Sequence, residues 1–371
     1  MTVTVREIPP GRSLRPFIDL AWEMNASDPT WVPPLRLQLR TLLDRRKHPF
    51  HRHAEVAYLL AERAGHPVGR IAAIVNHRHN EFHDERTGFF GFFECENDAA
   101  TARALFEAAE GWLRARGMDQ VRGPMNFSTN EECGLLVDGF GKEPAIMMPY
   151  NPPYYGSLIE GAGYRKEKDL LAYALDRAPA PERLVRGVER LARREKATVR
   201  PIDPKHFARD VGIIKDIYNA AWEENWGFVP MTDEEFEFMA REMKPVYDPD
   251  LCLIAEVDGE PAGFSLALPD LNVAFKPLDG RLFPFGFLRF LWHRRKVWRV
   301  RILTLGIRAE HRHRALGPLL YLRTWLVGEG EKGYHGEASW ILEDNREMNL
   351  ALEKMGAYVN KRYRIYLRPL G

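Results

Sequence analysis

A basic turn in the last quarter of the chain carries the residues best suited to chemistry. Leu303–Leu320 contains a predicted strand, a turn with Arg312 and Arg314, and a helix that begins at about Ala315. The first backbone N–H groups of a helix have no acceptors within the helix, and with the helix dipole they bind phosphate groups. Arginine adds a charge that can donate two hydrogen bonds to one phosphate. We therefore predict a phosphate-binding turn, although an ordinary solvent-exposed basic turn would have the same composition.

Polar side chains gather in the first half of the chain, between residues 122 and 155. The set comprises Asn126, Ser128, Asn130, Glu131, Glu132, Tyr150 and Tyr154. Such groups can line a ligand pocket between two domains. Asn and Ser side chains also often bond to the backbone of their own loop. The sequence leaves both interpretations open.

Histidines form two groups in the first half, at residues 48–53 and 77–83. Their spacing matches no zinc-binding pattern and no cysteine accompanies them, so we expect no metal site. The pKa of imidazole lies close to neutral pH, which suits a proton acceptor. His79 or His83 is therefore a candidate base, or a group that orients an acceptor.

A segment rich in both aromatic and basic residues spans Arg281–Arg301. Its members include Phe285, Phe287, Arg294, Arg295 and Lys296. The mixture suits contact with anionic lipid head groups. Stacking on nucleic acid bases would use the same residue types, and so would a buried aromatic insertion with a basic rim. The formal net charge of the whole chain is only +1, which gives no general reason to expect a nucleic acid partner.

The overall composition is that of a globular protein large enough for two domains. The chain has 371 residues, and 45% of them are hydrophobic. Its three cysteines lie far apart, which argues against a disulfide framework. The first residues lack a signal-peptide pattern, and we find no apolar run long enough to span a membrane. We expect a cytoplasmic protein, with peripheral membrane contact left open.

The sequence repeats itself weakly. Ala21-Trp22-Glu23 recurs as Ala221-Trp222-Glu223, residues 61–69 resemble residues 255–263, and residues 158–164 resemble residues 352–358. Matches in the same order and at similar spacing predict two homologous halves. We place these at residues 1–178 and 179–371, with a charged, helical connector at Pro181–Lys196.

Each half has the pattern of an α/β unit. In the second half, two apolar runs flank Asp258-Gly259, a strong hairpin signal. A strand rich in branched residues, a helix, a second helix ended by Gly356 and a closing strand follow. This order predicts an α/β fold in which each half is a mixed sheet flanked by helices.

The first half has an acidic turn where the second half has its basic one. Glu94, Glu96 and Asp98 precede the helix that begins at about Ala99. Like charges repel, so these carboxylates disfavour a phosphate. Asp98 is better explained as a helix N-cap. We therefore expect a phosphate to bind only the second half.

The order of elements in the second half resembles the GNAT acyltransferase superfamily. The pyrophosphate signature of that superfamily, Gln/Arg-x-x-Gly-x-Gly/Ala, is similar to residues 312–317, where Ala replaces the central Gly. The matching residues are Arg312, His313, Arg314, Ala315, Leu316 and Gly317. Asn345 and the helix that ends at Gly356 match the downstream pattern. The resemblance implies two tandem GNAT-like domains, the first with a degenerate cofactor loop, and acyl-CoA as co-substrate without a metal.

The resemblance also implies roles for individual residues. Leu305, Gly306 and Ile307 would pair with the pantetheine arm, and Asn345 would lie at the cofactor. A backbone N–H of that strand would polarise the thioester carbonyl. The acceptor amine must lose a proton before it attacks. The candidate bases, in order of preference, are Glu131, Glu224 and His83.

The chain as a whole is similar to a bacterial tandem-GNAT group that includes bacterial ceramide synthases. This similarity implies transfer of a long acyl chain to the amine of a sphingoid base. The aromatic and basic insertion, residues 270–299, fits a lipid acceptor. The residues expected to bind the acceptor are Asn126, Ser128, Asn130, Tyr150, Tyr154, Trp222, Phe285 and Phe287. The alternatives are an N-acetyltransferase for a small soluble amine and a non-catalytic binding protein that uses the insertion.

Overall fold

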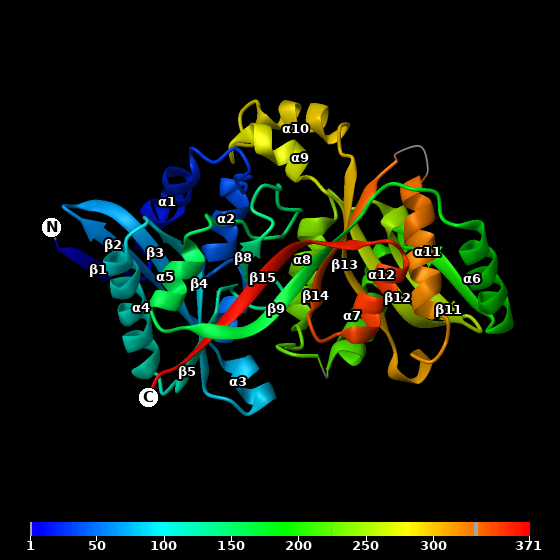
Figure 1. Cartoon of the computed structure of the whole chain (residues 1–371), viewed down its shortest axis with the longest axis horizontal. Coiled ribbons are helices and arrows are strands. Elements are labelled where there is room, and N and C mark those ends of the chain that lie inside the picture. Colours follow the sequence, from blue (N-terminus) through cyan, green and yellow to red (C-terminus); the bar gives the residue numbers. More distant parts are fainter. Residues whose placement is uncertain (1, 224, 330–332) are drawn as a thin grey trace.

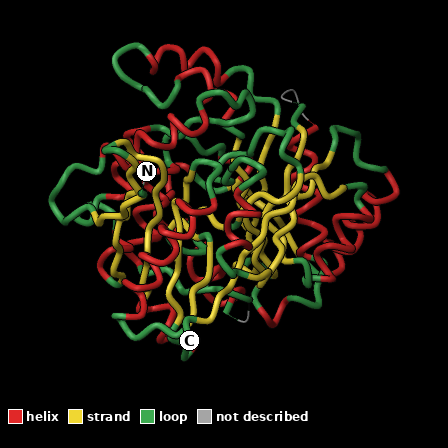
Figure 2. Tube along the Cα trace, turned by 60° about the vertical axis from the view of Figure 1, so that its left-hand side comes forward, coloured by secondary structure: helices red, strands yellow, loops and turns green. Residues whose placement is uncertain are grey.

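The computed structural model describes residues 2–223, 225–329 and 333–371. This part of the chain forms one open sheet of 13 strands with helices on both faces (Figures 1 and 2). The strands of the first half are β1 (Val3–Glu7), β2 (Ala54–Arg63), β3 (His66–Asn76), β4 (Thr87–Cys95), β5 (Gln120–Gly123), β8 (Leu135–Asp138) and β9 (Arg165–Leu175). Those of the second half are β10 (Ala197–Pro201), β11 (Cys252–Val257), β12 (Glu260–Pro269), β13 (Arg299–Ile307), β14 (His335–Leu342) and β15 (Tyr358–Pro369). A separate ribbon pairs β6 (Met125–Asn126) with β7 (Glu132–Cys133).

The two halves exchange their last strands. The order across the sheet is β1-β2-β3-β4-β5-β15-β9-β14-β13-β12-β11-β10, and β8 pairs with β15. Strand β15 therefore completes the first half beside β5, and β9 completes the second half beside β14. Read from its outer edge, each half has the same strand order, as the repeats predict. The two sheets nevertheless form one, because pairing β9 with β15 leaves neither strand with an unpaired edge at the centre.

Helices cover both faces of each half because the strands alternate apolar side chains between the faces. In β3, Ile71, Ala73 and Val75 pack with α4 (Ala99–Arg114), whereas Ala72 and Ile74 pack with α1 (Arg15–Asn25). In the second half α6 (Glu182–Arg194) and α11 (Leu316–Glu329) cover one face and α7 (Phe207–Trp222) the other. The shorter helices are α2 (Arg36–Leu43), α3 (His77–His83), α5 (Tyr155–Gly161), α8 (Asp233–Met243), α9 (Asn272–Phe275), α10 (Gly286–Arg294) and α12 (Arg346–Lys354).

Each half contains one parallel strand pair that separates part-way along. Strands β4 and β5 pair only from Thr87 to Phe89, and β13 and β14 pair only from Arg299 to Ile302. Beyond these points the strands diverge, so each half of the sheet has an opening at an equivalent place.

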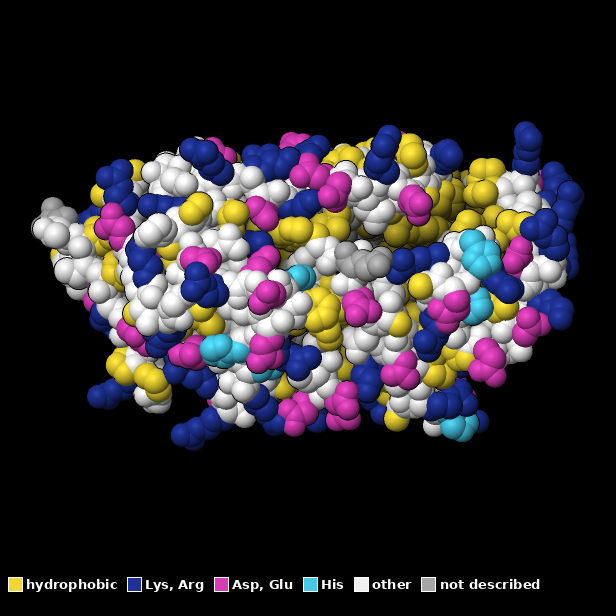
Figure 3. Space-filling model, turned by 90° about the horizontal axis from the view of Figure 1, so that it is seen from below, with side chains coloured by type: hydrophobic (Ala, Val, Ile, Leu, Met, Phe, Trp, Pro, Cys, Tyr) yellow, Lys and Arg dark blue, Asp and Glu magenta, His cyan; other side chains and the backbone are white. Residues whose placement is uncertain are grey.

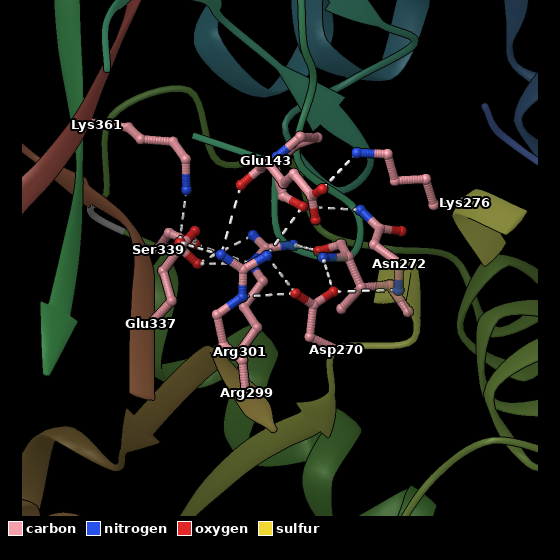
Figure 4. A network of polar contacts seen from close by, with 11 residues as sticks. Glu143, Asp270, Asn272, Lys276, Arg299, Arg301, Glu337, Ser339 and Lys361 are labelled. Carbon is pink, nitrogen blue, oxygen red and sulfur yellow. Dashed lines mark hydrogen bonds and ion pairs between the residues drawn. The ribbon is translucent and has the colours of Figure 1, made fainter. Parts of the chain in front are cut away.

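A buried ionic network fixes the two halves together (Figure 4). Lys361 of β15 lies 2.8 Å from Glu337 of β14, and both side chains are buried. Arg301 of β13 donates hydrogen bonds to the carbonyl groups of Ile146 (2.7 Å) and Met147 (3.0 Å) in the first half. The network therefore holds the 146–147 segment against the second half.

The structure bears out the local sequence signals. Asp258 and Gly259 both have positive φ angles, 51° and 88°, as a type I′ hairpin turn requires. The connector is helical as α6, and Asp98 caps α4 by accepting from the backbone N–H groups of Ala100 and Thr101. In the described part of the chain, no helix has both the length and the apolar character to span a bilayer.

Candidate active site

A cavity of about 520 Å³ occupies the opening between β13 and β14 in the second half. Figure 3 shows a hollow lined by hydrophobic side chains on one side of the face seen from below, with basic side chains beside it. One wall of the cavity is Leu303–Ile307, the part of β13 that has separated from β14. Helix α7, which packs against β13, contributes Tyr218 and Trp222 to the lining. The free edge of β13 can therefore pair with an extended amide chain.

Gly306 lets α7 approach β13 closely. A Cβ atom at this position would lie 2.7 Å from Cε1 of Phe264 and 3.3 Å from Cβ of Ala221. Both distances are tighter than ordinary van der Waals contact, so a larger residue would push the helix or the ring away. The glycine thus sets the width of the cavity beside the strand.

The basic turn lies at one end of this cavity. Arg312, Arg314 and Gly317 line it, whereas Ala315 and Leu316 are buried and His313 is exposed. Arg312 donates to the carbonyl group of Ala221 (2.9 Å), and Arg314 lies 3.9 Å from the Glu195 carboxylate. Asn345 lines the cavity and accepts a hydrogen bond from the backbone N–H of Met348, which caps α12.

Replacing Arg312 and Arg314 by alanine should weaken coenzyme A binding at least tenfold, about 1.4 kcal/mol, because two phosphate partners are lost. Isothermal titration calorimetry with coenzyme A measures the change. Arg323→Ala is the matched control, since Arg323 is exposed on α11, the helix that follows the basic turn, and is absent from the described cavity lining. Equal coenzyme A affinity in the parent and the double variant would contradict the assignment of the basic turn as the pyrophosphate site.

A second cavity of about 400 Å³ adjoins the first and reaches into the first half. Its lining includes Phe92, Phe93 and Glu94 of β4, together with Leu39 of α2 and Phe275 of α9. The residues that line both cavities are Asn130, Glu131, Met147, Met231, Met239 and Met243. A molecule in one cavity can thus meet a molecule in the other at Glu131.

Glu131 has the protonation properties of a base that works near neutral pH. Burial raises the pKa of its carboxyl group to about 7, and hydrogen bonds from Ser128 oppose that rise. The Ser128 backbone N–H (3.1 Å) and hydroxyl (2.5 Å) both donate to Oε2. These two bonds fix the carboxylate at the junction.

The other expected acceptor-binding residues divide into two groups. Asn126, Asn130, Tyr150 and Trp222 line one or both cavities. Tyr154 instead donates to the Cys95 carbonyl (2.8 Å) and packs against the core of the first half. Phe285, which directly precedes α10, and Phe287 on α10 are 74% and 48% exposed and, within the described chain, belong to neither lining. Ser128 is absent from the described linings and contributes through its hydrogen bonds with Glu131 and with the backbone N–H of Asn130.

Among the candidate bases in the described part of the chain, Glu131 alone lines a cavity. The Nε2 atom of His83 lies 2.8 Å from the Phe228 carbonyl oxygen, and the described linings of both cavities lack this histidine. Glu224 lies outside the described residues.

Tyr218 and Glu235 belong to the site but carry no distinguishing sequence signal. The hydroxyl of Tyr218 donates to Oδ1 of Asn130 (2.8 Å), and burial raises the pKa of Tyr218. Glu235 lines the second cavity and lies 2.9 Å from Nε2 of His53. In the sequence, Tyr218 is one more position in an amphipathic helix and Glu235 is a capping-box residue.

The acidic turn of the first half is closed by an arginine. Arg63 lies 2.7 Å from both Glu96 and Asp98. The place that corresponds to the basic turn is thus filled by the protein's own charges, which agrees with phosphate binding in the second half alone.

Comparison with known proteins decides the family. No family model matches the chain. It is 38% identical over 368 residues to the bacterial ceramide synthase of Caulobacter vibrioides, an alignment that covers 96% of this chain and 95% of that one. The chain belongs to the tandem GNAT acyltransferases. It is also 37% identical over 372 residues to protein YghO of Escherichia coli, with 96% and 93% coverage.

Solved structures agree on the fold of this tandem GNAT acyltransferase. A tandem GNAT protein from the clavulanic acid biosynthesis pathway superposes with a TM-score of 0.58 at 13% identity, covering 100% of this chain and 99% of that one. A GCN5-related N-acetyltransferase from Sphaerobacter thermophilus gives 0.51 at 16% identity, covering 99% and 96%. The protein is therefore a GNAT-type N-acyltransferase, and its fold implies acyl-CoA as co-substrate.

Proposed function

We propose that this enzyme transfers a long acyl chain from acyl-CoA to the amine of a sphingoid-type lipid, as a ceramide synthase does. The position of Glu131 at the junction of two largely apolar cavities carries the proposal. One cavity has the separated strand and basic turn suited to acyl-CoA, and the other offers room for a second large substrate. The relative that is 38% identical bears the name bacterial ceramide synthase, which supports the same acceptor class.

The reaction follows from the groups at the junction. The acceptor arrives as an ammonium ion, and the Glu131 carboxylate accepts one proton from it. The neutral amine nitrogen attacks the thioester carbonyl carbon, so that a C–N bond forms and the C–S bond breaks. The nitrogen loses a second proton to the departing thiolate, giving an amide and the free thiol. Glu131 then releases its proton to water.

Strand β13 offers the acyl-CoA a free strand edge and a hydrogen-bond donor for its thioester. One edge of Leu303–Ile307 is paired with β12, where Leu305 pairs with Ser265 and Gly306 with Phe264. The other edge faces the cavity and is free to pair with the pantetheine arm. A backbone N–H on that edge stabilises the negative charge that develops on the carbonyl oxygen. Arg312 and Arg314 then hold the pyrophosphate.

Product analysis tests the proposal. The protein is incubated with acyl-CoAs of several chain lengths and with both a sphingoid base and a small soluble amine, and amides are identified by mass spectrometry. We expect amides of the sphingoid base with long acyl chains. Acetylation of the soluble amine alone would make the enzyme an acetyltransferase of small amines. Absence of any acyl transfer would contradict both and leave a binding protein.

We further propose that α10 docks the enzyme on an anionic membrane, where a lipid acceptor resides. Phe290 packs inward, stacked on Phe275 of α9, whereas Phe283 and Trp292 are 69% and 63% exposed. This exposure disfavours a wholly buried aromatic insertion. Arg289, Arg294, Arg295 and Lys296 are exposed on the same segment. Helices α9 and α10 project together from one side of the molecule (Figure 1).

Changing Arg294, Arg295 and Lys296 to Glu should abolish co-sedimentation with anionic liposomes, because each basic residue near such a surface contributes about 1 kcal/mol. Coenzyme A affinity should not change. The matched control reverses the charge of three exposed arginines of α6 by changing Arg183, Arg190 and Arg193 to Glu. Retained liposome binding in the α10 variant, or equal loss in the α6 variant, would contradict docking through α10.

A further inference from the structure

The first half keeps the opening in its sheet although it has lost the basic turn. Strands β4 and β5 separate after the pair Phe89–Arg122, as β13 and β14 do after Ile302–Ala338. The outer end is closed by Arg63 with Glu96 and Asp98. Deeper in, the diverging strands leave the second cavity, with Phe92, Phe93 and Glu94 of β4 on one side.

Apolar side chains form most of this cavity wall. They come from the sheet, from α2 and α9 with the residues that precede them, from α8 and from the 144–150 segment. They include Leu35, Leu39, Phe93, Ile146, Leu271 and Phe275. Its volume of about 400 Å³ lies in the range of small-molecule sites, about 300–1,000 Å³. The wall therefore suits a hydrocarbon chain.

The charged groups in the lining are mainly acidic. The carboxylates are Glu94, Glu131, Glu132, Glu235 and Glu242, and the one guanidinium in the described lining is Arg70. Arg70 lies 3.4 Å from Glu94, so its charge is already compensated. Burial lowers the pKa of His48 to about 4, which leaves this imidazole neutral at pH 7. Glu235 is paired with His53 at 2.9 Å, which leaves Glu131, Glu132 and Glu242 as the other acidic side chains of the lining. An ammonium group beside Glu131 would stabilise its buried carboxylate, which a neutral acyl chain cannot do, so a cationic ligand is favoured.

We propose that the opening in the first half, no longer a coenzyme A site, binds a long-chain amine. The ammonium group lies at Glu131 and the hydrocarbon extends between α2 and α9. This inference rests on the proposed function for the chemistry at Glu131, but the binding itself is measurable without turnover. Phe275 lines the cavity and stacks on Phe290 of α10, so the α9 side of the cavity packs directly against α10.

Leu39→Trp tests the site by filling it. Equilibrium binding is followed by protein fluorescence with two sphingoid bases that share the 2-amino-1,3-diol head group, one long-chain and one short-chain. We expect the dissociation constant of the long-chain base to rise at least tenfold, with little change for the short-chain base and for coenzyme A. Leu37→Trp is the matched control, since Leu37 is 54% exposed on the same helix and is absent from the described lining. Leu39→Phe adds less volume and should give a smaller effect in the same direction.

The outcomes separate this inference from the proposed function. Unchanged long-chain amine binding in both Leu39 variants would overturn the site. A changed preference for acyl-CoA chain length, with amine binding intact, would assign the cavity to the acyl chain and also overturn it. Size-dependent amine binding that Leu39→Trp abolishes, in a parent that makes no amide, would uphold the site and refute the proposed reaction.

Discussion

Glu131→Gln should lower kcat by about a hundredfold to ten-thousandfold, the usual contribution of a positioned general base. The amide keeps the size of the side chain and can still accept the Ser128 hydrogen bonds, but it cannot take a proton at neutral pH. Steady-state rates with saturating acyl-CoA and amine measure the loss. Glu131→Asp keeps the carboxylate and should lose less activity than the Gln variant.

The pH profile separates a base from a merely structural residue. Because the pKa of Glu131 is raised to about 7, the parent rate should fall about tenfold per pH unit below that value as the carboxylate becomes protonated. The Gln variant should lack this step. A parent-like rate or an unchanged acidic limb in Glu131→Gln would remove Glu131 as the base.

The raised pKa of Glu131 also predicts how the stability of the protein changes with pH. A carboxyl group whose pKa is raised on folding binds more protons in the folded state, so its contribution to stability falls as pH rises from its usual range to about 7. Glu131→Gln should therefore unfold at the same or a higher temperature than the parent at pH 8. Loss of activity without loss of stability is the expected combination.

Lys361→Met should destabilise the protein by about 3–5 kcal/mol, because it removes one partner of a buried ion pair. Lys361 and Glu337 are 0% and 1% exposed, and their closest atoms are 2.8 Å apart. Two guanidinium groups also interact with Glu337, but both are engaged elsewhere. Arg299 lies at 3.7 Å and is already bonded to Asp270 at 2.6 Å, and Arg301 donates to the carbonyl groups of Ile146 and Met147. Without Lys361, the buried Glu337 carboxylate would thus be less well compensated. Denaturant unfolding of parent and variant measures the difference.

A second substitution distinguishes the loss of charge compensation from the loss of packing. Adding Glu337→Gln to Lys361→Met removes the uncompensated carboxylate, so the double variant should be more stable than Lys361→Met alone. Lys354→Met, on the exposed side of α12, should change stability by no more than about 0.5 kcal/mol. A cost below about 1 kcal/mol for Lys361→Met would show that the pair does not hold β15 in place.

Much of the candidate site could be predicted because its parts are local in sequence. The basic turn follows directly from a strand and precedes a helix, so its position at the cavity needs only the order of elements. Glu131 could be proposed as a polar residue in a loop. Its place at the junction could not, because that depends on Met231 and Met239 of the second half closing around it. His83 was the third candidate base and Tyr154 an expected acceptor-binding residue, but their hydrogen bonds to the Phe228 and Cys95 carbonyl groups engage them elsewhere.

By itself the sequence determined the local elements and the twofold repeat of this protein. The turn at Asp258-Gly259, the Asp98 cap and the connector helix α6 each depend on residues within a few positions of one another. Only the tertiary structure decided that β9 and β15 are exchanged and that Lys361 meets Glu337 in the core. Backbone hydrogen bonds between strands are nearly independent of side chains, so β15 could pair with either half. The choice is made by the side chains that become buried together, and these lie far apart in the chain.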